Sequence, residues 1–456
     1  MKRFLTILLT ILSVFVLFSS CTDGSPQDAE ANSSPTVTVT ATAAASPAAQ
    51  QTDENTPSPE PSQTNNTSVP KDEKEYVFEF NTARNTTFAQ QIFETDDSIY
   101  CIERLSAHSY EELIYFSDKE YQDWMPLCSK PNCIHNSEDC NAMPEGYAAN
   151  RMWIYGRHIY YAVSDTSSDG LGRNIELWRM KLDGSDHERL FNYSIHDSDK
   201  YKEACKITPP TLSYGWYFHD KYFIIKNDFI FIGEGGTTLH TTMHEELAYD
   251  LDDLDKEPVD LSFINDDGAY DTGGYVLAGQ GEYLYRVEDD KQTLIRQSLE
   301  TGERKVICEL PISVMLRGGM LEGDTLYVLN DWSYLNLHRQ IFAVDVNTGE
   351  YSMIFDGENE PMFLIGAGYV FGLIREDDAE LERGFYIYNL NGELKSFIPY
   401  EETGMDIYTY YVSENYVLGY EYERYLQGSS FWRTPEYYLN MTDIENGTPH
   451  WKKWGE

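Results

Sequence analysis

The sequence predicts an all-β fold, a seven-bladed β-propeller, for the part of the chain that follows residue 75. Three observations lead to this prediction. A short apolar strand pattern recurs seven times, four hairpins with glycine at the tip follow these repeats, and capped apolar stripes with helical spacing are missing beyond the N-terminal segment. Six or eight blades would also fit. A two-sheet sandwich is the weaker alternative because it does not predict a sevenfold repeat.

In each repeat, a polar or glycine-containing turn precedes an apolar residue with an aromatic or second apolar neighbour. The equivalent positions are Ile99, Ile159, Tyr222, Leu284, Leu326, Val370 and Val417. One four-stranded sheet cannot bury both of its faces, whereas sheets packed around an axis bury them against each other. The predicted blades span residues 76–145, 146–205, 206–266, 267–312, 313–358, 359–402 and 403–456.

The four hairpins lie at 177–191, 294–307, 341–355 and 385–398. Their tips read LDG, ETG, NTG and LNG, which place glycine where a tight turn needs a positive φ angle. Two segments could close the ring: "KEYVFEFNT" at 74–82 joins the last blade, or "HWKKW" at 450–454 completes it alone. We expect "SDTSSDGLGRN" and "EGGTTLHTTMH" to form loops on one rim.

The first 20 residues have the features of a lipoprotein signal peptide. Lys2 and Arg3 are positively charged, and the apolar run from Phe4 to Phe18 is short for a bilayer-spanning helix. The stretch "LFSSC" resembles a bacterial lipobox, although Phe18 stands where Leu, Val or Ile is commoner. The resemblance implies that Cys21 becomes the first mature residue and carries a palmitate-type acyl anchor in the membrane. An ordinary signal peptide is the alternative.

Residues 21–75 predict a disordered tether. Beyond the cysteine they contain no aromatic residue and are dominated by Ser, Thr, Pro, Ala, Asn and Gln, so they cannot bury enough apolar area to offset their conformational entropy. Residues 76–456 are rich in aromatic and aliphatic residues and predict a single propeller domain. The chain of 456 residues carries a formal net charge of −42, which makes nucleic acid a poor partner.

One stretch, "PLCSKPNCIHNSEDCNA", gathers three cysteines and a histidine: Cys128, Cys133, His135 and Cys140. Thiolates and a neutral imidazole are donors that zinc prefers, so the spacing predicts a closed structural zinc site on a loop after the first blade. Disulfide bonding is the alternative because the predicted domain is exported. In that case Cys101 is the best partner outside the cluster.

Other candidate sites have simple structural explanations or only a weak signal. The acidic stretch 249–260 lacks the glycine of a calcium loop, and we expect a hairpin turn there. His240 and His244 do not follow the H-E-x-x-H order and are expected to be surface residues. A few aromatic residues in loop-like stretches could stack on sugar rings or hold a peptide: Trp332, Tyr334, Phe431 and Trp432.

The hairpin "LWRMKLDGSDHERL" resembles the recurring hairpin of bacterial extracytoplasmic propellers found in Tol-type and related uncharacterised lipoproteins. The signal, the tether and "LCSKPNCIHNSEDC" together resemble surface lipoproteins of anaerobic Gram-positive bacteria. The resemblance implies a lipid-anchored propeller on the outer face of the cell membrane. It implies no particular activity, because propellers serve many functions.

The sequence therefore predicts a non-catalytic surface lipoprotein that binds a glycan, a peptide or another envelope protein. It contains no nucleophile-elbow, P-loop, dinucleotide-binding or kinase motif. One alternative is an extracytoplasmic hydrolase or lyase with a site at the central channel, where loops from several blades converge. Another is a structural component of the envelope.

Overall fold

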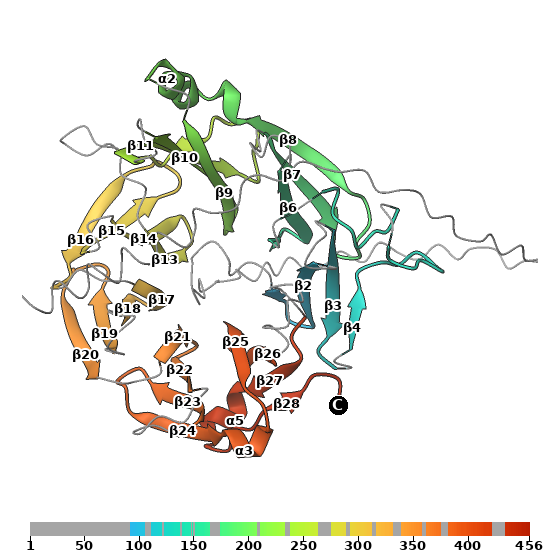
Figure 1. Cartoon of the computed structure of the whole chain (residues 1–456), viewed down its shortest axis with the longest axis vertical. Coiled ribbons are helices and arrows are strands. Elements are labelled where there is room, and N and C mark those ends of the chain that lie inside the picture. Colours follow the sequence, from blue (N-terminus) through green and yellow to red (C-terminus); the bar gives the residue numbers. More distant parts are fainter. Residues whose placement is uncertain are drawn as a thin grey trace, which may run out of the picture. The chain divides into compact units, whose positions relative to one another are not determined.

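The computed structural model describes residues 92–456, apart from 105–110, 121–122, 137–138, 147, 149–150, 165–173, 208–209, 233–237, 263–274, 289–291, 312–315, 332–338, 358–361, 375–381 and 422–433. The described residues belong to one compact unit, 73–456. They form seven four-stranded antiparallel sheets around a central axis (Figure 1). The predicted seven-bladed propeller is confirmed.

Within each blade the strands pair in chain order, so that each blade is a simple meander. The first four blades consist of β1 (Ile92–Glu94), β2 (Ser98–Arg104), β3 (Glu112–Asp118), β4 (Trp124–Pro126); β5 (Trp153–Tyr155), β6 (His158–Ser164), β7 (Asn174–Lys181), β8 (Glu188–Ser194); β9 (Thr211–His219), β10 (Tyr222–Ile232), β11 (Thr238–Asp250), β12 (Val259–Asp260); and β13 (Tyr275–Gln280), β14 (Tyr283–Val287), β15 (Thr293–Ser298), β16 (Arg304–Glu309). The last three consist of β17 (Leu316–Glu322), β18 (Thr325–Asp331), β19 (Arg339–Asp345), β20 (Tyr351–Gly357); β21 (Met362–Gly366), β22 (Tyr369–Ile374), β23 (Gly384–Asn389), β24 (Leu394–Pro399); and β25 (Ile407–Val412), β26 (Tyr416–Glu421), β27 (Tyr437–Asn440), β28 (Lys452–Lys453).

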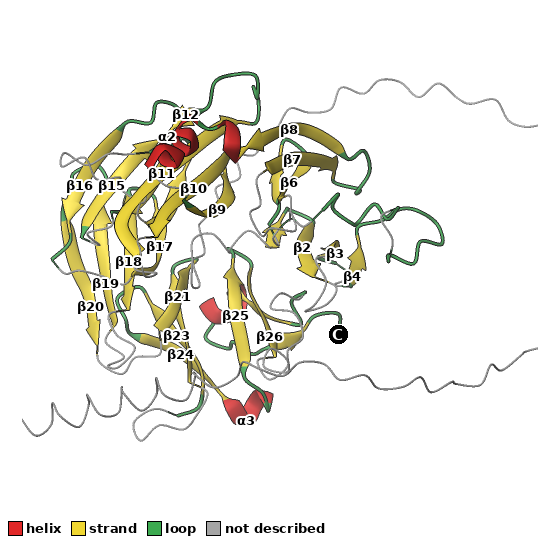
Figure 2. Ribbon diagram, turned by 45° about the horizontal axis from the view of Figure 1, so that its top comes forward, coloured by secondary structure: helices red, strands yellow, loops and turns green. Residues whose placement is uncertain are grey.

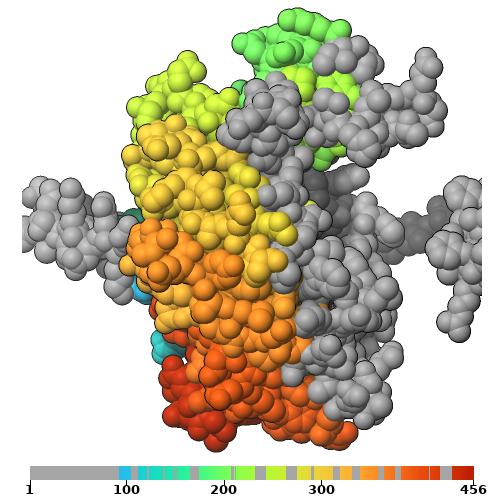
Figure 3. Space-filling view, turned by 90° about the vertical axis from the view of Figure 1, so that its left-hand side faces the viewer, coloured from blue at the N-terminus to red at the C-terminus, as the bar shows by residue number. Residues whose placement is uncertain are grey.

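The first strand of each blade lies towards the centre of the ring and the fourth at its circumference (Figures 1 and 2). Strands in the middle of a blade are covered on both faces: five consecutive residues of β6, Ile159 to Val163, are buried. Outer strands are partly open to solvent, and Tyr351 and Met353 of β20 are 42% and 48% exposed. Figure 3 shows this outer wall, where successive blades follow one another from yellow to red.

The repeat predicted from the sequence matches the blades. All seven equivalent apolar residues lie on the second strand of a blade, and each sheet lies inside one predicted range. The four predicted hairpins join third and fourth strands. "HWKKW" supplies β28, which pairs with β27, so all the described strands of the seventh sheet are C-terminal. The segment 74–82 lies outside the described residues.

One loop prediction was partly wrong. In "EGGTTLHTTMH", residues 234–237 lie outside the described part, but β11 already begins at Thr238 and pairs with β10. The threonines are β-branched and favour an extended strand, and Met243 within this stretch is buried. The outcome is one long hairpin in place of a rim loop.

Short helices interrupt the sheets. A 3₁₀ turn (Ile195–Asp197) and α2 (Asp199–Ile207) separate the second and third blades, α3 (Tyr400–Thr403) precedes the seventh, and α5 (Met441–Glu445) lies between β27 and β28. These helices carry no strong sequence signal because each is too short for a repeated apolar stripe. Among the described residues, no helix has the length and apolar character needed to cross a membrane.

The hydrophobic core is divided among the blade interfaces. Leu294 of the fourth blade shares one core cluster with Phe342 of the fifth, and Phe371 of the sixth shares another with Leu439 of the seventh. The last interface joins the ends of the ring through Ile99 and Leu418. Each blade is therefore stabilised by its two neighbours, as expected for sheets that cannot bury both of their faces alone.

The glycine at each predicted hairpin tip also makes contact between blades. At Gly349 the φ angle is +76°, and a Cβ atom would overlap with the carbonyl oxygen of Ile307 on the preceding blade. At Gly184 and Gly302 the close neighbour is likewise a backbone carbonyl of the preceding blade, whereas at Gly392 it is the side-chain ring of Phe355. Glycine is thus favoured at these tips by the turn and by the neighbouring blade.

Candidate metal centre

The cysteine-rich stretch leaves and rejoins the first blade at a single residue of β3. The amide of Leu127 donates to the carbonyl of Ile114 at 2.8 Å, and the amide of Ile114 donates to the carbonyl of Ala142 at 2.8 Å. The residues between Leu127 and Ala142 therefore form a loop whose base is closed by two hydrogen bonds. This loop continues from β4 on the outer edge of the blade.

Local backbone geometry turns the chain sharply within this loop. The amide of Cys133 donates to the carbonyl of Lys130 at 3.3 Å, and Asn132 and His135 have positive φ angles of 61° and 53°. Asn and His adopt this conformation more readily than most residues. The side chain of Ile134 is consequently turned outwards and is 76% exposed, while its two neighbours turn inwards.

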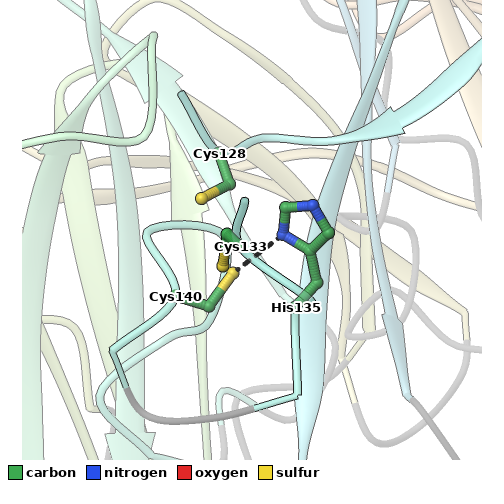
Figure 4. Close-up of side chains that lie close together, drawn as sticks. All are labelled: Cys128, Cys133, His135 and Cys140. Atoms are coloured by element: carbon green, nitrogen blue, oxygen red, sulfur yellow. Dashed lines mark hydrogen bonds between the residues drawn. The ribbon is translucent and has the colours of Figure 1, made fainter. Parts of the chain in front are cut away.

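The four side chains predicted as ligands come together. Their ligand atoms all lie within 4.8 Å of one another, and the Nδ1 atom of His135 is 3.3 Å from the Sγ atom of Cys140. Figure 4 shows the sulfurs and the imidazole ring directed towards a common region. In a tetrahedral zinc–thiolate site, neighbouring sulfurs are about 3.8 Å apart, as bond lengths near 2.3 Å require. Small side-chain movements would suffice to reach that geometry.

Two of the thiols have shifted pKa values. Burial opposes the ionisation of Cys128, but hydrogen bonds from the backbone at Lys130 and Asn141 and from the thiols of Cys133 and Cys140 outweigh it, so the pKa of Cys128 is lowered. Burial, together with the neighbouring thiols, raises the pKa of Cys140 to about 12. A bare group of three thiols therefore ionises only in part, because adjacent thiolates repel each other.

The second blade holds both ends of the loop. Gly184, at the turn between β7 and β8, approaches the carbonyl oxygen of Leu127 so closely that a Cβ atom would overlap with it. The Nε2 atom of His187 donates to the carbonyl of Asn141 at 3.0 Å, and its Nδ1 atom accepts from the hydroxyl of Tyr161 at 2.9 Å. The sequence pattern "LDG" predicted the turn but not this contact.

The donor set fits a zinc ion. Three soft sulfur ligands and one imidazole nitrogen match closed tetrahedral zinc sites, and four protein ligands leave no position for a substrate. The three cysteines are thiols in this structure and form no disulfide with one another. The group could therefore hold a metal ion, as the spacing predicted.

The remaining predicted site residues do not join this group. Trp332, Tyr334, Phe431, Trp432 and Cys21 lie outside the described residues, so their predicted roles stay predictions. The acidic stretch forms the connection between β11 and β12, as expected for a hairpin turn.

The surface prediction for His244 was wrong. This residue is fully buried, with Nδ1 2.8 Å from a carboxylate oxygen of Asp228 and Nε2 3.5 Å from Glu246. Two acidic side chains hold it inside the propeller, and together they raise its pKa although burial itself acts in the opposite direction. The side chain of His240 lies outside the described part.

The same partners extend into a buried ionic chain that joins the third and fourth blades. Arg286 on β14 donates to both carboxylate oxygens of Glu246, at 2.6 and 2.9 Å, and the hydroxyl of Tyr217 donates to one of them at 2.6 Å. Burial disfavours the charge of Glu246, but Arg286 and His244 hold its pKa well below the usual range. The strand alternation in "YLYRV" already places Arg286 on the same face as buried Leu284, a signal that sequence reasoning missed.

No protein-family profile and no curated protein matches the chain. Three solved structures resemble the chain at 12% sequence identity. An uncharacterized protein from Listeria monocytogenes EGD-e has a TM-score of 0.40, with coverage of 81% of this chain and 95% of that one. Dipeptidyl peptidase 4 from Porphyromonas gingivalis has a TM-score of 0.36, with 72% and 50% covered. A puromycin hydrolase has a TM-score of 0.39, with 82% and 55% covered. The chain thus spans about half the length of the two enzymes, and these similarities concern the fold alone.

Proposed function

We propose that the chain is a lipid-anchored, extracytoplasmic propeller that binds a glycan, a peptide or an envelope protein without converting it, and that its Cys3His group holds one structural zinc ion. The observation that carries the zinc assignment is the convergence of four ligand atoms within 4.8 Å of one another on a loop with a closed base. Four protein ligands complete a tetrahedral zinc sphere, which supports a structural role for the ion.

The loop needs a cross-link because it has little core of its own. Among its described residues between Leu127 and Ala142, only Cys140 is buried, and Ile134 points into solvent. A bound cation would favour the thiolate form of all three cysteines and tie the segment together, as metals do in small domains without a core. Cys128, Cys133, His135 and Cys140 would hold it.

The proposed cellular location follows from the sequence. The signal-like segment, the lipobox-like cysteine and the polar tether support display of the propeller outside the cell, with Cys21 carrying the lipid. The net charge of −42 supports a soluble domain that stays clear of anionic lipid surfaces. The cysteine-rich loop follows β4, the strand at the circumference of the first blade, which supports a role in stability in preference to catalysis.

Native mass spectrometry of the purified full-length chain tests the zinc assignment. We expect a mass gain that corresponds to one zinc ion per chain and that disappears with acid or a strong chelator. The C133S variant should bind no zinc, and the matched control C205S, which changes the exposed cysteine on α2, should bind as the parent does. A chain that binds no zinc even after its cysteines have been reduced would contradict the assignment.

Two further measurements test the rest of the proposal. Metabolic labelling with palmitate should mark the parent chain in a bacterial host and leave the C21S variant unlabelled. Glycan and peptide arrays probed with the same protein should show selective binding. Failure of palmitate to label the parent protein would contradict the proposed lipid anchor. Turnover of an arrayed compound without its retention would favour an enzyme.

A further inference from the structure

The three thiols of the metal group differ in their access to solvent. Cys128 and Cys133 are partly exposed, whereas Cys140 is only 2% exposed and contacts the Nδ1 atom of His135. A reagent in solution therefore meets the first two sulfurs before the third. Because zinc–thiolate bonds leave electron density on sulfur, exposed thiolate ligands remain open to oxidation.

We propose that this loop is an oxidation-sensitive zinc switch, in which a peroxide-class oxidant joins Cys128 to Cys133 and releases the ion. The proposal rests on the proposed zinc site and adds its regulation. It also explains why the same four residues fit both a metal site and a disulfide by sequence: the two arrangements are the reduced and oxidised states of one loop.

The step balances as follows. Two zinc-bound thiolates, those of Cys128 and Cys133, lose one electron each and form one S–S bond. Hydrogen peroxide accepts the two electrons with two protons, its O–O bond breaks, and two water molecules form. The zinc ion loses two of its four ligands, and the remaining pair of one thiolate and one imidazole holds it too weakly to retain it.

The geometry favours this pair of cysteines. Their Sγ atoms lie within 4.8 Å of each other and need to approach to about 2 Å, the length of an S–S bond. The turn at Lys130, closed by the Cys133 amide, already folds the intervening four residues back on themselves. Cys140 keeps its contact with His135 inside the protein, where it is only 2% exposed and shielded from an oxidant in solution.

The change should stay local. The base of the loop depends on hydrogen bonds to Ile114, and its ends depend on contacts with Gly184 and His187 of the second blade. None of these contacts involves sulfur or zinc. Oxidation therefore rearranges the loop tip around exposed Ile134 and leaves the propeller intact, and reduction in the presence of zinc restores the first state.

The experiment uses the zinc-loaded full-length chain. Hydrogen peroxide is added in steps, released zinc is measured with a chromogenic chelator, and thiols are mapped by alkylation before and after unfolding. We expect one zinc released per Cys128–Cys133 disulfide, an unmodified Cys140, unchanged circular dichroism of the sheets, and full recovery after reduction with added zinc. The C205S control should release zinc with the same dependence on peroxide.

Two results would overturn the switch. Zinc could stay bound at peroxide levels that fully oxidise the exposed thiol of Cys205, or mapping could find Cys140 in the disulfide. Failure of the two proposals can be told apart, because a chain that never binds zinc contradicts the zinc assignment, whereas a chain that binds zinc and keeps it under peroxide contradicts only the switch.

Discussion

The indole rings of Trp124 and Trp454 stack across the seam between the first and last blades, with centroids 5.8 Å apart and planes inclined by 29°. Each indole N–H is used as well: Trp124 donates to the carbonyl of Pro435 at 2.9 Å, and Trp454 donates to the hydroxyl of Ser117 at 2.8 Å. Because the described seventh sheet contains only C-terminal strands, these aromatic and polar contacts close the ring across the seam.

The substitution Trp454→Ala should therefore weaken the interface between the first and last blades. Trp454 is only 7% exposed, and truncation of a buried tryptophan costs about 3–5 kcal/mol of unfolding free energy. Urea unfolding followed by fluorescence measures the loss. The control Leu394→Ala removes a side chain that is 54% exposed and should change stability by no more than about 0.5 kcal/mol. Equal losses in the two variants would contradict this account of ring closure.

Glycine-to-alanine substitutions at two turns can distinguish the free-energy cost of backbone strain from that of steric overlap. Gly323 and Gly349 have positive φ angles of 58° and 76°, but only at Gly349 would a Cβ atom collide with a neighbouring carbonyl, that of Ile307. Gly323→Ala should cost about 1–2 kcal/mol, the penalty for a left-handed alanine. Gly349→Ala should cost at least about 2 kcal/mol more, because the two blades must move apart. Thermal unfolding of both variants checks the difference, and similar melting temperatures would argue against a tight contact between blades.

The buried pair of Arg286 and Glu246 should behave as a unit. Arg286→Met leaves a carboxylate buried without its main counter-charge, which costs about 3–5 kcal/mol. Combining it with Glu246→Gln should recover part of this loss, so the two effects will not be additive. The matched control is Arg179→Met, which breaks an exposed pair with Glu188 and should cost less than about 1 kcal/mol. Additive losses in the double variant would show that the two residues do not couple.

Stability should fall in mild acid because of His219. This imidazole is 2% exposed, and burial lowers its pKa to about 4 despite its hydrogen bond to the carbonyl of Gly281. Between pH 6.5 and pH 4 the unfolded chain binds a proton that the folded chain does not, so folding is weakened as pH falls through this window. The full effect is about 3 kcal/mol at 1.36 kcal/mol per pH unit.

The variant His219→Gln isolates that contribution. Glutamine cannot titrate and can still donate to Gly281, so its stability curve should decline less steeply between pH 6.5 and pH 4 than that of the parent. Other buried groups, such as Glu246 and His244, titrate equally in both proteins and cancel in the comparison. Parallel curves would mean that His219 is not the source of acid sensitivity.

The sequence predicted the four residues of the candidate metal group but not the contacts that support their loop. The spacing of Cys128, Cys133, His135 and Cys140 was enough because ligands within thirteen residues must lie near one another on a short loop. The closure of the loop at Ile114 and its support by His187 depend on where the first and second blades meet. Those contacts are set by packing between segments whose sequences carry no mutual signal.

The sequence by itself predicted seven blades, with six or eight left open, and located the hairpin tips, because a period of two and a glycine at a turn act within a few residues. Only the tertiary structure decided which polar residues would be sealed between blades. Glu246 and Arg286 are 40 residues apart and become partners only when two sheets pack face to face, and His244 is drawn inside with them. The free energy of a buried charge depends on its final neighbours, so local patterns could suggest that Arg286 is buried but could not identify its partners.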